Sequence, residues 1–216
     1  WGALCEEAGF PKGVVNIVTG PAGEIGDEIC ANPLVKKITF TGSTSVGKLL
    51  IQKSAATVKK VSMELGGNAP FLIFDDADLD RAVEGAITAN YRNSGQTCVC
   101  TNRFFAQAGI YDRFVEKLAE ASRKLKVGPG LEAGVQQGPL IDAKAVEKVE
   151  EFIEDAKANG GKVVAGGSRH ALGGTFFEPT VIAGATPKMK FMKDEIFGPV
   201  APVFKFETEE EVIELA

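Results

Sequence analysis

Short apolar strands alternate with amphipathic helices along most of the chain, and this alternation limits the fold more than any other feature. A β-branched run at 37–40, for example, is followed by a helical pattern at 44–55. Parallel strands need a long crossover connection, usually a helix, so this alternation is typical of βαβ units. The sequence therefore predicts an α/β protein that begins with part of a doubly wound nucleotide-binding sheet.

The alternating pattern forms two consecutive series. The first predicts strands at 14–18, 37–40 and 58–65, with helices at 3–8, 24–31 and 44–55. The second predicts strands at 71–74, 103–107, 162–165, 177–182 and 200–206, with helices at 78–90, 111–126 and 142–159. We expect a first domain over 1–67 and a second over 68–216.

Two of the predicted helices carry a clear apolar face. In the helix at 44–55 this face consists of Val46, Leu49 and Leu50. In the helix at 142–159 a buried stripe is expected from Val146, Val149, Phe152 and Ile153.

Composition excludes several classes of partner. The net charge is −5, and the 24 Lys and Arg residues form no basic stripe, which argues against a nucleic-acid surface. No apolar run approaches the roughly 20 residues that span a bilayer. The first residues carry no basic-then-apolar signal pattern either, so we expect a cytoplasmic protein. The four cysteines and the single His170 fit neither a disulfide framework nor a zinc site, so we expect no metal. The chain starts at Trp1 and stops at Ala216 inside predicted helices, so we expect it to be an inactive piece of a longer protein.

Four motifs occur in a fixed order along the chain. They are Phe40-Thr41-Gly42-Ser43, Glu64-Leu65-Gly66-Gly67-Asn68, Arg92-Asn93-Ser94-Gly95-Gln96-Thr97-Cys98-Val99-Cys100 and Glu195-Ile196-Phe197-Gly198-Pro199. In order and spacing they resemble the aldehyde dehydrogenase superfamily, and the likeness runs from end to end. Within it, Arg92 and Cys100 are most similar to succinate-semialdehyde dehydrogenases. The resemblance implies that 1–67 is the C-terminal part of an NAD(P)-binding domain and 68–216 a truncated catalytic domain.

The resemblance assigns the chemistry to Cys98 and Glu64. Cys98 would add to an aldehyde carbon, and the resulting oxyanion would release hydride to a nicotinamide and leave a thioester. Glu64 would be the general base that activates the hydrolytic water, a task suited to a partly buried carboxylate. From the residues alone, Cys98 could equally be a small buried hydrophobe and Glu64 a solvated residue before a turn.

The resemblance also implies NAD or NADP as cofactor. Thr41, Gly42 and Ser43 lie between a strand and a helix, where backbone N–H groups can meet a phosphate. Residues 42–48 also fit a P-loop pattern, but Leu49 stands where that motif needs Ser or Thr for magnesium. A plain strand-to-helix turn is the other alternative.

The remaining cofactor contacts come from the resemblance alone. Val46 would help form the adenine pocket, and Leu65 would touch the nicotinamide end. Glu195 would bind the nicotinamide ribose, and Phe197 would pack beside the ring; read only as structure, Phe197 is ordinary core.

Arg92 and Cys100 suggest a substrate and a form of regulation. Six residues before Cys98, Arg92 could hold a substrate carboxylate bidentately, or it could be a surface arginine at a helix end. Cys100 could trap Cys98 in a reversible disulfide, or it could be inert packing.

These observations lead to one interpretation and two rivals. We expect an NAD(P)-dependent aldehyde dehydrogenase that acts on a small aldehyde, succinate semialdehyde. We also expect its full-length form to be a homo-oligomer. An enzyme for another semialdehyde, such as glutarate semialdehyde, is one rival. A catalytically silent nucleotide-binding or scaffold domain is the other.

Overall fold

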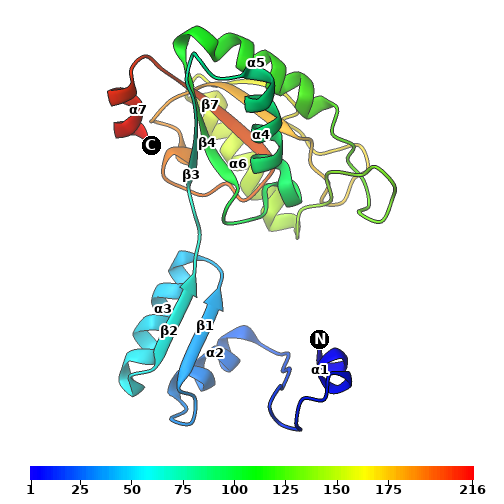
Figure 1. The fold of residues 1–216 in the computed structure, drawn as a ribbon, viewed down its shortest axis with the longest axis vertical. Helices are drawn as coiled ribbons and strands as arrows, with labels where there is room; N and C mark the ends of the chain where they lie inside the picture. The colour runs from blue at the N-terminus through cyan, green and yellow to red at the C-terminus, as the bar shows by residue number, and fades with distance from the viewer. The chain divides into compact units, whose positions relative to one another are not determined.

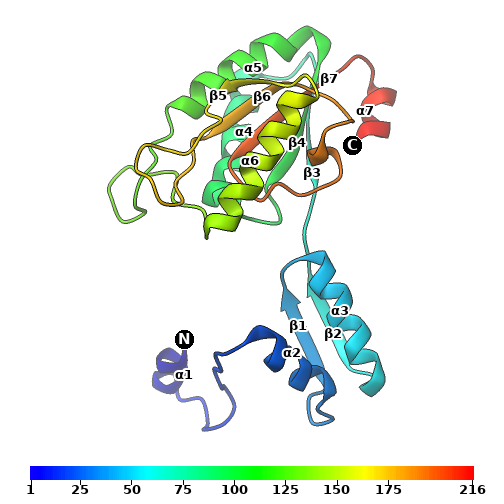
Figure 2. The same cartoon turned by 180° about the vertical axis from the view of Figure 1, so that it is seen from behind.

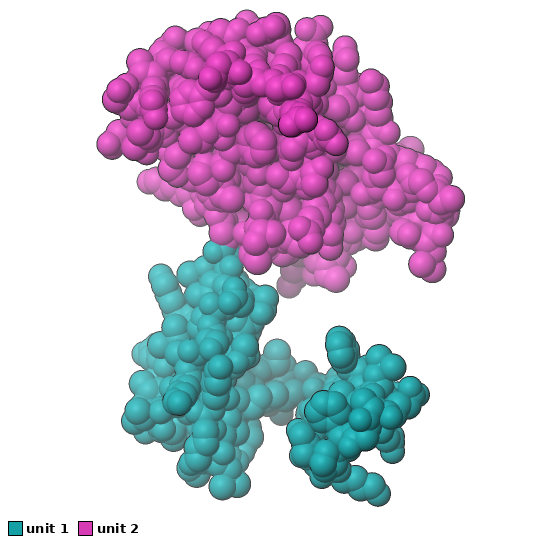
Figure 3. All heavy atoms as spheres, viewed as in Figure 1, with its two compact units in different colours: residues 1–66 teal, residues 67–216 magenta.

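A computed structural model describes all 216 residues, which form two compact units, Trp1–Gly66 and Gly67–Ala216 (Figures 1 and 3). Each unit is built around its own sheet: two strands in the first and five in the second. No helix is both long and apolar enough to cross a bilayer.

The first unit contains a single βαβ motif. Strands β1 (Lys37–Thr41) and β2 (Lys60–Glu64) are parallel, and they are joined by helix α3 (Thr44–Ser54) and the 3₁₀ turn η1 (Ala55–Thr57). Helices α1 (Gly2–Glu7) and α2 (Ala22–Ala31) precede it. Thr41 pairs with Glu64, so the carboxyl ends of the two strands meet at one edge of the sheet.

The predicted strand at 14–18 is wrong. This segment is irregular, and Val14, Ile17 and Val18 are all more than 60% exposed. In the first unit β1 and β2 pair only with each other, so the segment has no partner for its backbone groups. A β-branched run becomes a strand only when a neighbour supplies those hydrogen bonds.

The expected face of α3 also differs. Val46 and Leu49 are exposed, and the position that packs most closely is Gly47, where a Cβ would come within 2.4 Å of the Leu65 side chain. Leu50 is half-buried, near Gly26 of α2. The absence of a side chain therefore sets the approach of this helix to the end of β2.

The second unit is built on a sheet with the strand order β3-β4-β7-β6-β5. The strands are β3 (Ala69–Ile73), β4 (Thr101–Gln107), β5 (Lys162–Ala165), β6 (Thr180–Ala185) and β7 (Val200–Phe206). All neighbouring pairs are parallel except β5–β6, which is antiparallel. The predicted strand at 177–182 thus begins three residues later, because Phe177 forms only an isolated bridge with Arg169.

Helices cover both faces of this sheet, as the two opposite views of the ribbon show (Figures 1 and 2). Helices α4 (Leu79–Tyr91) and α5 (Ala108–Arg123) pack on one face, and α6 (Ala143–Ala158) with η3 (Lys190–Met192) on the other. The short helix α7 (Glu209–Leu215) follows β7.

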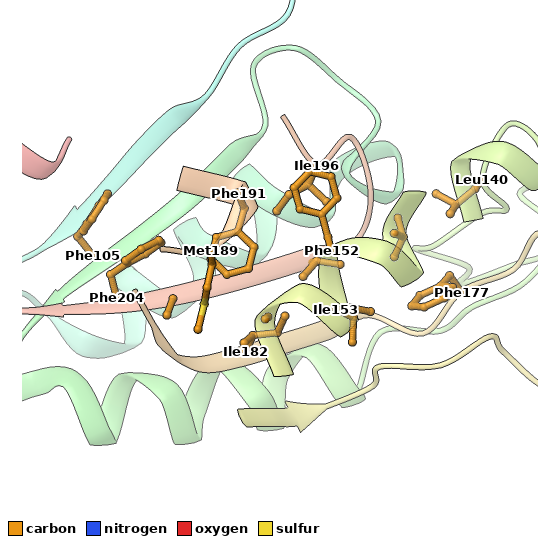
Figure 4. Close-up of a cluster of buried hydrophobic side chains, with 14 of the residues drawn as sticks. Phe105, Leu140, Phe152, Ile153, Phe177, Ile182, Met189, Phe191, Ile196 and Phe204 are labelled. Atoms are coloured by element: carbon orange, nitrogen blue, oxygen red, sulfur yellow. The ribbon is translucent and has the colours of Figure 1, made fainter. Parts of the chain in front are cut away.

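Successive side chains of β4 point to opposite faces of the sheet, so the strand contributes to both hydrophobic cores. Phe104 and Ala106 join the core under α4 and α5, whereas Phe105 joins the core under α6. Phe105 stacks on Phe204 of β7 with 4.8 Å between ring centroids, inside the cluster drawn in Figure 4. The predicted stripe of α6 is confirmed, since its four residues are at most 4% exposed.

Candidate active site

The loop between α4 and β4 carries Cys98 and has an uncommon backbone. Its first turn, η2 (Arg92–Gly95), contains Asn93, Ser94 and Gly95 with φ angles of 51°, 57° and 74°. Left-handed conformations cost non-glycine residues of the order of 1 kcal/mol or more, and they persist only where the surroundings fix them.

Side chains of this loop fix it to the segment before α6. Ser94 Oγ donates to the carbonyl of Gly138 at 2.9 Å. Gln96 Nε2 donates to Pro139 O at 3.3 Å, and Gln96 Oε1 accepts from Ile141 N at 2.8 Å. The sequence alone assigned Gln96 no role. These two partners lie 43 and 45 positions away, so no local pattern identifies it.

Two glycines place this loop directly against neighbouring backbone. A Cβ on Gly95 would lie 2.0 Å from Gly198 O, and a Cβ on Gly67 would lie 2.4 Å from Cys98 O. Side chains at either position would therefore collide with main chain, which cannot move as a side chain can. The result is a loop held closely on two sides.

The two cysteines of the loop have different surroundings. Cys98 is exposed, whereas Cys100 is 9% exposed. The Cys100 thiol is in hydrogen-bond contact with Thr97 Oγ1 and with the carbonyl of Arg92 at 3.6 Å. Cys98 is thus open to solvent, while Cys100 is packed and hydrogen-bonded.

Glu195 lies close to this loop through Gly67. Its Oε1 accepts a hydrogen bond from Gly67 N at 3.2 Å, and Gly67 in turn abuts the carbonyl of Cys98. Phe197 has a left-handed backbone, with φ of 54°, and remains 39% exposed. It borders a hollow together with Asn93, Gln96, Pro139, Leu140 and Ile141.

Arg92 faces a separate open hollow of about 570 Å³. The hollow runs along α4 and is also lined by Arg81, Glu84, Gly85, Thr88, Ala89, Val99 and Cys100. Arg92 is exposed and forms no ion pair. Its guanidinium is therefore available to an anion that enters the hollow.

The first unit contains the predicted phosphate-binding turn and the predicted general base, and the two lie close together. Gly42 N donates to Glu64 O at 3.0 Å, which joins the turn after β1 to the end of β2. Ser43 caps α3, since its Oγ accepts from Val46 N at 3.4 Å. Glu64 is exposed in this chain, so the expected partial burial of its carboxylate is not found.

The edge of the first unit has features that fit a dinucleotide. All residues from Thr41 to Val46 are exposed, so the N-terminus of α3 is open. Backbone N–H groups and hydroxyls at such a terminus suit phosphate oxygens, and Val46, 41% exposed, offers apolar surface. No group of three or more His, Cys, Asp or Glu side chains has the geometry to hold a metal ion.

Comparisons with known proteins agree over the whole chain. Residues 2–216 match the sequence family described as "Aldehyde dehydrogenase family". The chain is 62% identical over 214 residues to a 3-sulfolactaldehyde dehydrogenase of Pseudomonas putida, and 61% identical over 213 residues to a glutarate-semialdehyde dehydrogenase of Pseudomonas aeruginosa. Each alignment covers 99% of this chain and 44% of the relative.

A solved structure shares the fold. The crystal structure of succinate-semialdehyde dehydrogenase from Burkholderia pseudomallei matches with a TM-score of 0.98 and 59% identity, over 100% of this chain and 45% of that one. The chain spans less than half the length of these relatives.

Proposed function

The chain belongs to the aldehyde dehydrogenase family, and on that premise we propose that it supplies the nucleophile and part of the coenzyme site of an NAD(P)-dependent enzyme that oxidises an aldehyde to an acid. In this proposal residues 1–67 are part of the coenzyme-binding domain and 68–216 are part of the catalytic domain. The exposed Cys98, on a loop held closely by Gly67 and Gly198, is the observation that carries the proposal.

Cys98 is the nucleophile in this mechanism. Its thiolate adds to the aldehyde carbon, forming a C–S bond and a tetrahedral oxyanion. When the oxyanion collapses, the carbon–hydrogen bond breaks and a thioester remains on the sulfur. A bound nicotinamide coenzyme supplies the acceptor for that hydride. The fixed loop keeps the sulfur and the adjacent backbone in one geometry, which lowers the entropy cost of the addition.

Glu64 is the proposed general base of the second half-reaction. Its carboxylate takes a proton from water, the resulting hydroxide adds to the thioester carbon, and the Cys98 thiolate leaves as the acid is formed. Glu64 sits at the carboxyl end of β2, the edge at which open α/β sheets bind their ligands.

The proposed coenzyme contacts are divided between the two units. In the first unit, Thr41, Gly42 and Ser43 bind phosphate oxygens, with Val46 against the adenine and Leu65 toward the nicotinamide. In the second unit, Glu195 accepts hydrogen bonds from ribose hydroxyls, and Phe197 offers an aromatic face to the ring. The half-exposed Phe197 supports this contact, because a fully buried ring could not make it.

The proposed substrate is succinate semialdehyde, with its carboxylate held by Arg92. Three relatives are named for 3-sulfolactaldehyde, glutarate semialdehyde and succinate semialdehyde, each an aldehyde with an anionic group at its other end. An unpaired arginine in the hollow beside the cysteine loop suits that shared feature. Glutarate semialdehyde, one carbon longer, is the alternative.

Cys100 supports a proposal about oxidation. With peroxide as oxidant, the Cys98 thiolate is converted to a sulfenic acid; attack by the Cys100 thiol then forms an S–S bond and releases water. A bond between residues two apart departs from the usual disulfide geometry, so thiols reduce it readily. In the folded chain Cys98 is exposed to the oxidant, whereas Cys100 is packed.

Two measurements test the proposed function in the full-length protein. Cys98→Ala is expected to abolish NAD(P)-dependent aldehyde oxidation, because it removes the thiol that forms the thioester. Cys30→Ala, which removes a buried thiol of the first unit, is the control and retains activity. In Glu64→Gln, a burst of reduced coenzyme followed by a slow steady state is expected. Unchanged oxidation by Cys98→Ala would exclude this mechanism.

A further inference from the structure

A buried asparagine on β4 holds the segment that contains Glu195. Asn102 is 5% exposed and uses both ends of its amide. Its Nδ2 group approaches three acceptors, Asn68 Oδ1 at 2.6 Å, Phe191 O at 3.0 Å and Asp194 O at 3.1 Å. Its Oδ1 accepts from Ile196 N at 2.8 Å.

A second asparagine completes this arrangement. Asn68 Nδ2 donates to Met192 O at 3.1 Å, and the Asn68 carbonyl accepts from Arg103 Nη2 at 2.8 Å. Burial of the Arg103 guanidinium lowers its pKa, while its hydrogen bonds go to backbone carbonyls and, at 4.0 Å, to Met192 Sδ. Asn68 is therefore itself fixed to the start of β4.

Asn102 bonds the chain on both sides of Glu195. Asp194 and Ile196 are its chain neighbours, and Asn102 bonds the carbonyl of the first and the amide of the second. Glu195 also bonds Gly67 N, the residue before Asn68. Its backbone thus has little freedom to move without breaking hydrogen bonds of a buried amide, which are costly to lose.

Asn102 also lies four residues after Cys98 on the same stretch of chain. Asn102, which holds the segment around Glu195, thus lies in β4, the strand that directly follows the cysteine loop. A displacement of one segment therefore changes the position of the other.

We propose that Asn102 is a positioning residue that holds Glu195 in register with Cys98 for binding of the coenzyme ribose. This inference rests on the proposed function of Glu195. Asparagine is required because the site needs one acceptor and one donating group on a short planar side chain. Aspartate has the same shape, but its carboxylate would face three oxygens and repel them.

The test uses Asn102→Asp in the full-length protein, with the dissociation constant for NAD+ or NADP+ measured by fluorescence titration from pH 5 to pH 8. At pH 8 we expect binding to weaken by about tenfold to a hundredfold, because buried polar groups left without hydrogen-bond partners cost free energy of the size that changes an affinity by that factor. At pH 5 we expect partial recovery, because burial among acceptors raises the pKa of the introduced carboxyl and its O–H can then donate.

Two controls separate positioning from general damage. Asn90→Ala changes another buried asparagine of the same unit, whose Nδ2 has no hydrogen-bond partner, and should leave coenzyme binding unchanged. If Asn102→Asp does not fold, Asn68→Ala removes the bond to Met192 O and should weaken coenzyme binding in the same direction.

Each outcome has a separate meaning. If Asn102→Asp binds coenzyme as tightly as the wild type at pH 8, or if Asn90→Ala weakens binding equally, the positioning role is wrong. If the wild-type protein binds neither NAD+ nor NADP+, the proposed function fails instead. The alkylation rate of Cys98 by iodoacetamide, measured without coenzyme, shows in addition whether the thiol itself is intact in the variant.

Discussion

Gly95 and Gly198 lie with their backbones in direct contact, so that a Cβ on Gly95 would come within 2.0 Å of the Gly198 carbonyl oxygen. Gly95 also has a φ of 74°, which side chains rarely tolerate. The contact joins the cysteine loop to the end of the segment that holds Glu195 and Phe197. The geometry of the site therefore depends on two residues that have no side chain.

Gly95→Ala is expected to lower the free energy of unfolding by about 1–3 kcal/mol, because the substitution adds backbone strain and a collision with main chain. The displaced loop should also reduce kcat/KM. Denaturant unfolding and steady-state kinetics measure the two effects. Gly130→Ala is the matched control, since a Cβ there meets no atom within 4 Å. Equal stability of the two variants would contradict the close contact.

Arg92→Ala is expected to reduce kcat/KM for succinate semialdehyde by roughly a hundredfold, because charge-assisted hydrogen bonds contribute about 1.5–3 kcal/mol. Oxidation of an uncharged aldehyde of the same length should be unaffected. Arg81→Ala removes a second cation from the same hollow and serves as the control. Equal losses for both aldehydes would show that Arg92 does not recognise the carboxylate.

Cys100→Ala is expected to change the response to peroxide while activity is retained. Without the second thiol, the Cys98 sulfenic acid has no partner and is oxidised further, so inactivation should no longer be reversed by dithiothreitol. The recovered activity after peroxide and then dithiothreitol is the measurement, with Cys5→Ala as control. Identical recovery in the wild type and Cys100→Ala would exclude the proposed disulfide.

The ion pair between Glu150 of α6 and Arg169 predicts a pH-dependent effect on stability. Arg169 donates to the carboxylate through Nε at 2.7 Å and Nη2 at 2.8 Å, and these bonds lower the pKa of Glu150 below its ordinary value of 4.5. A carboxyl with a lowered pKa stabilises the folded protein above its unfolded-state pKa, and this contribution is lost as the pH falls through the folded-state pKa. Arg169→Ala should therefore lower the Tm more at pH 7 than at pH 3, where less of this contribution remains.

The matched comparison for this pair is Arg169→Ala in a Glu150→Gln background. There the arginine has lost its hydrogen-bonded carboxylate and keeps only the more distant charge of Glu147, so its removal should change the Tm less than in the wild type. A Tm difference that is the same at pH 3 and pH 7 would show that the ion pair does not contribute.

Most of the secondary structure could be predicted, because it follows from the local pattern of apolar and polar residues. The strands at 37–40 and 200–206 and the helix at 142–159 each have a periodicity that a short window reveals, and all three are found with ends that differ by at most one residue. The segment at 14–18 has the composition of a strand and is irregular, because a strand needs a partner that lies elsewhere in the chain.

The candidate site was only partly predictable. The motif around Cys98 is contiguous in the sequence and could be recognised there. The roles of Gln96 and Asn102 depend on segments that are distant in the sequence: Asn102 accepts from Ile196, 94 residues away. A stronger signal would have been polar residues at the starts of two neighbouring strands, Asn68 before β3 and Asn102 in the buried β4.

The sequence by itself determined most of the order of helices and strands, all but the strand expected at 14–18, because apolar periodicity and turn residues act over a few positions. It also determined the family, through four motifs that occur in a fixed order. Only the tertiary structure decided which strand is antiparallel, which face of α3 packs, and which buried amide holds the segment around Glu195. These features arise from contacts between distant segments, and no local pattern specifies which distant residue will meet another.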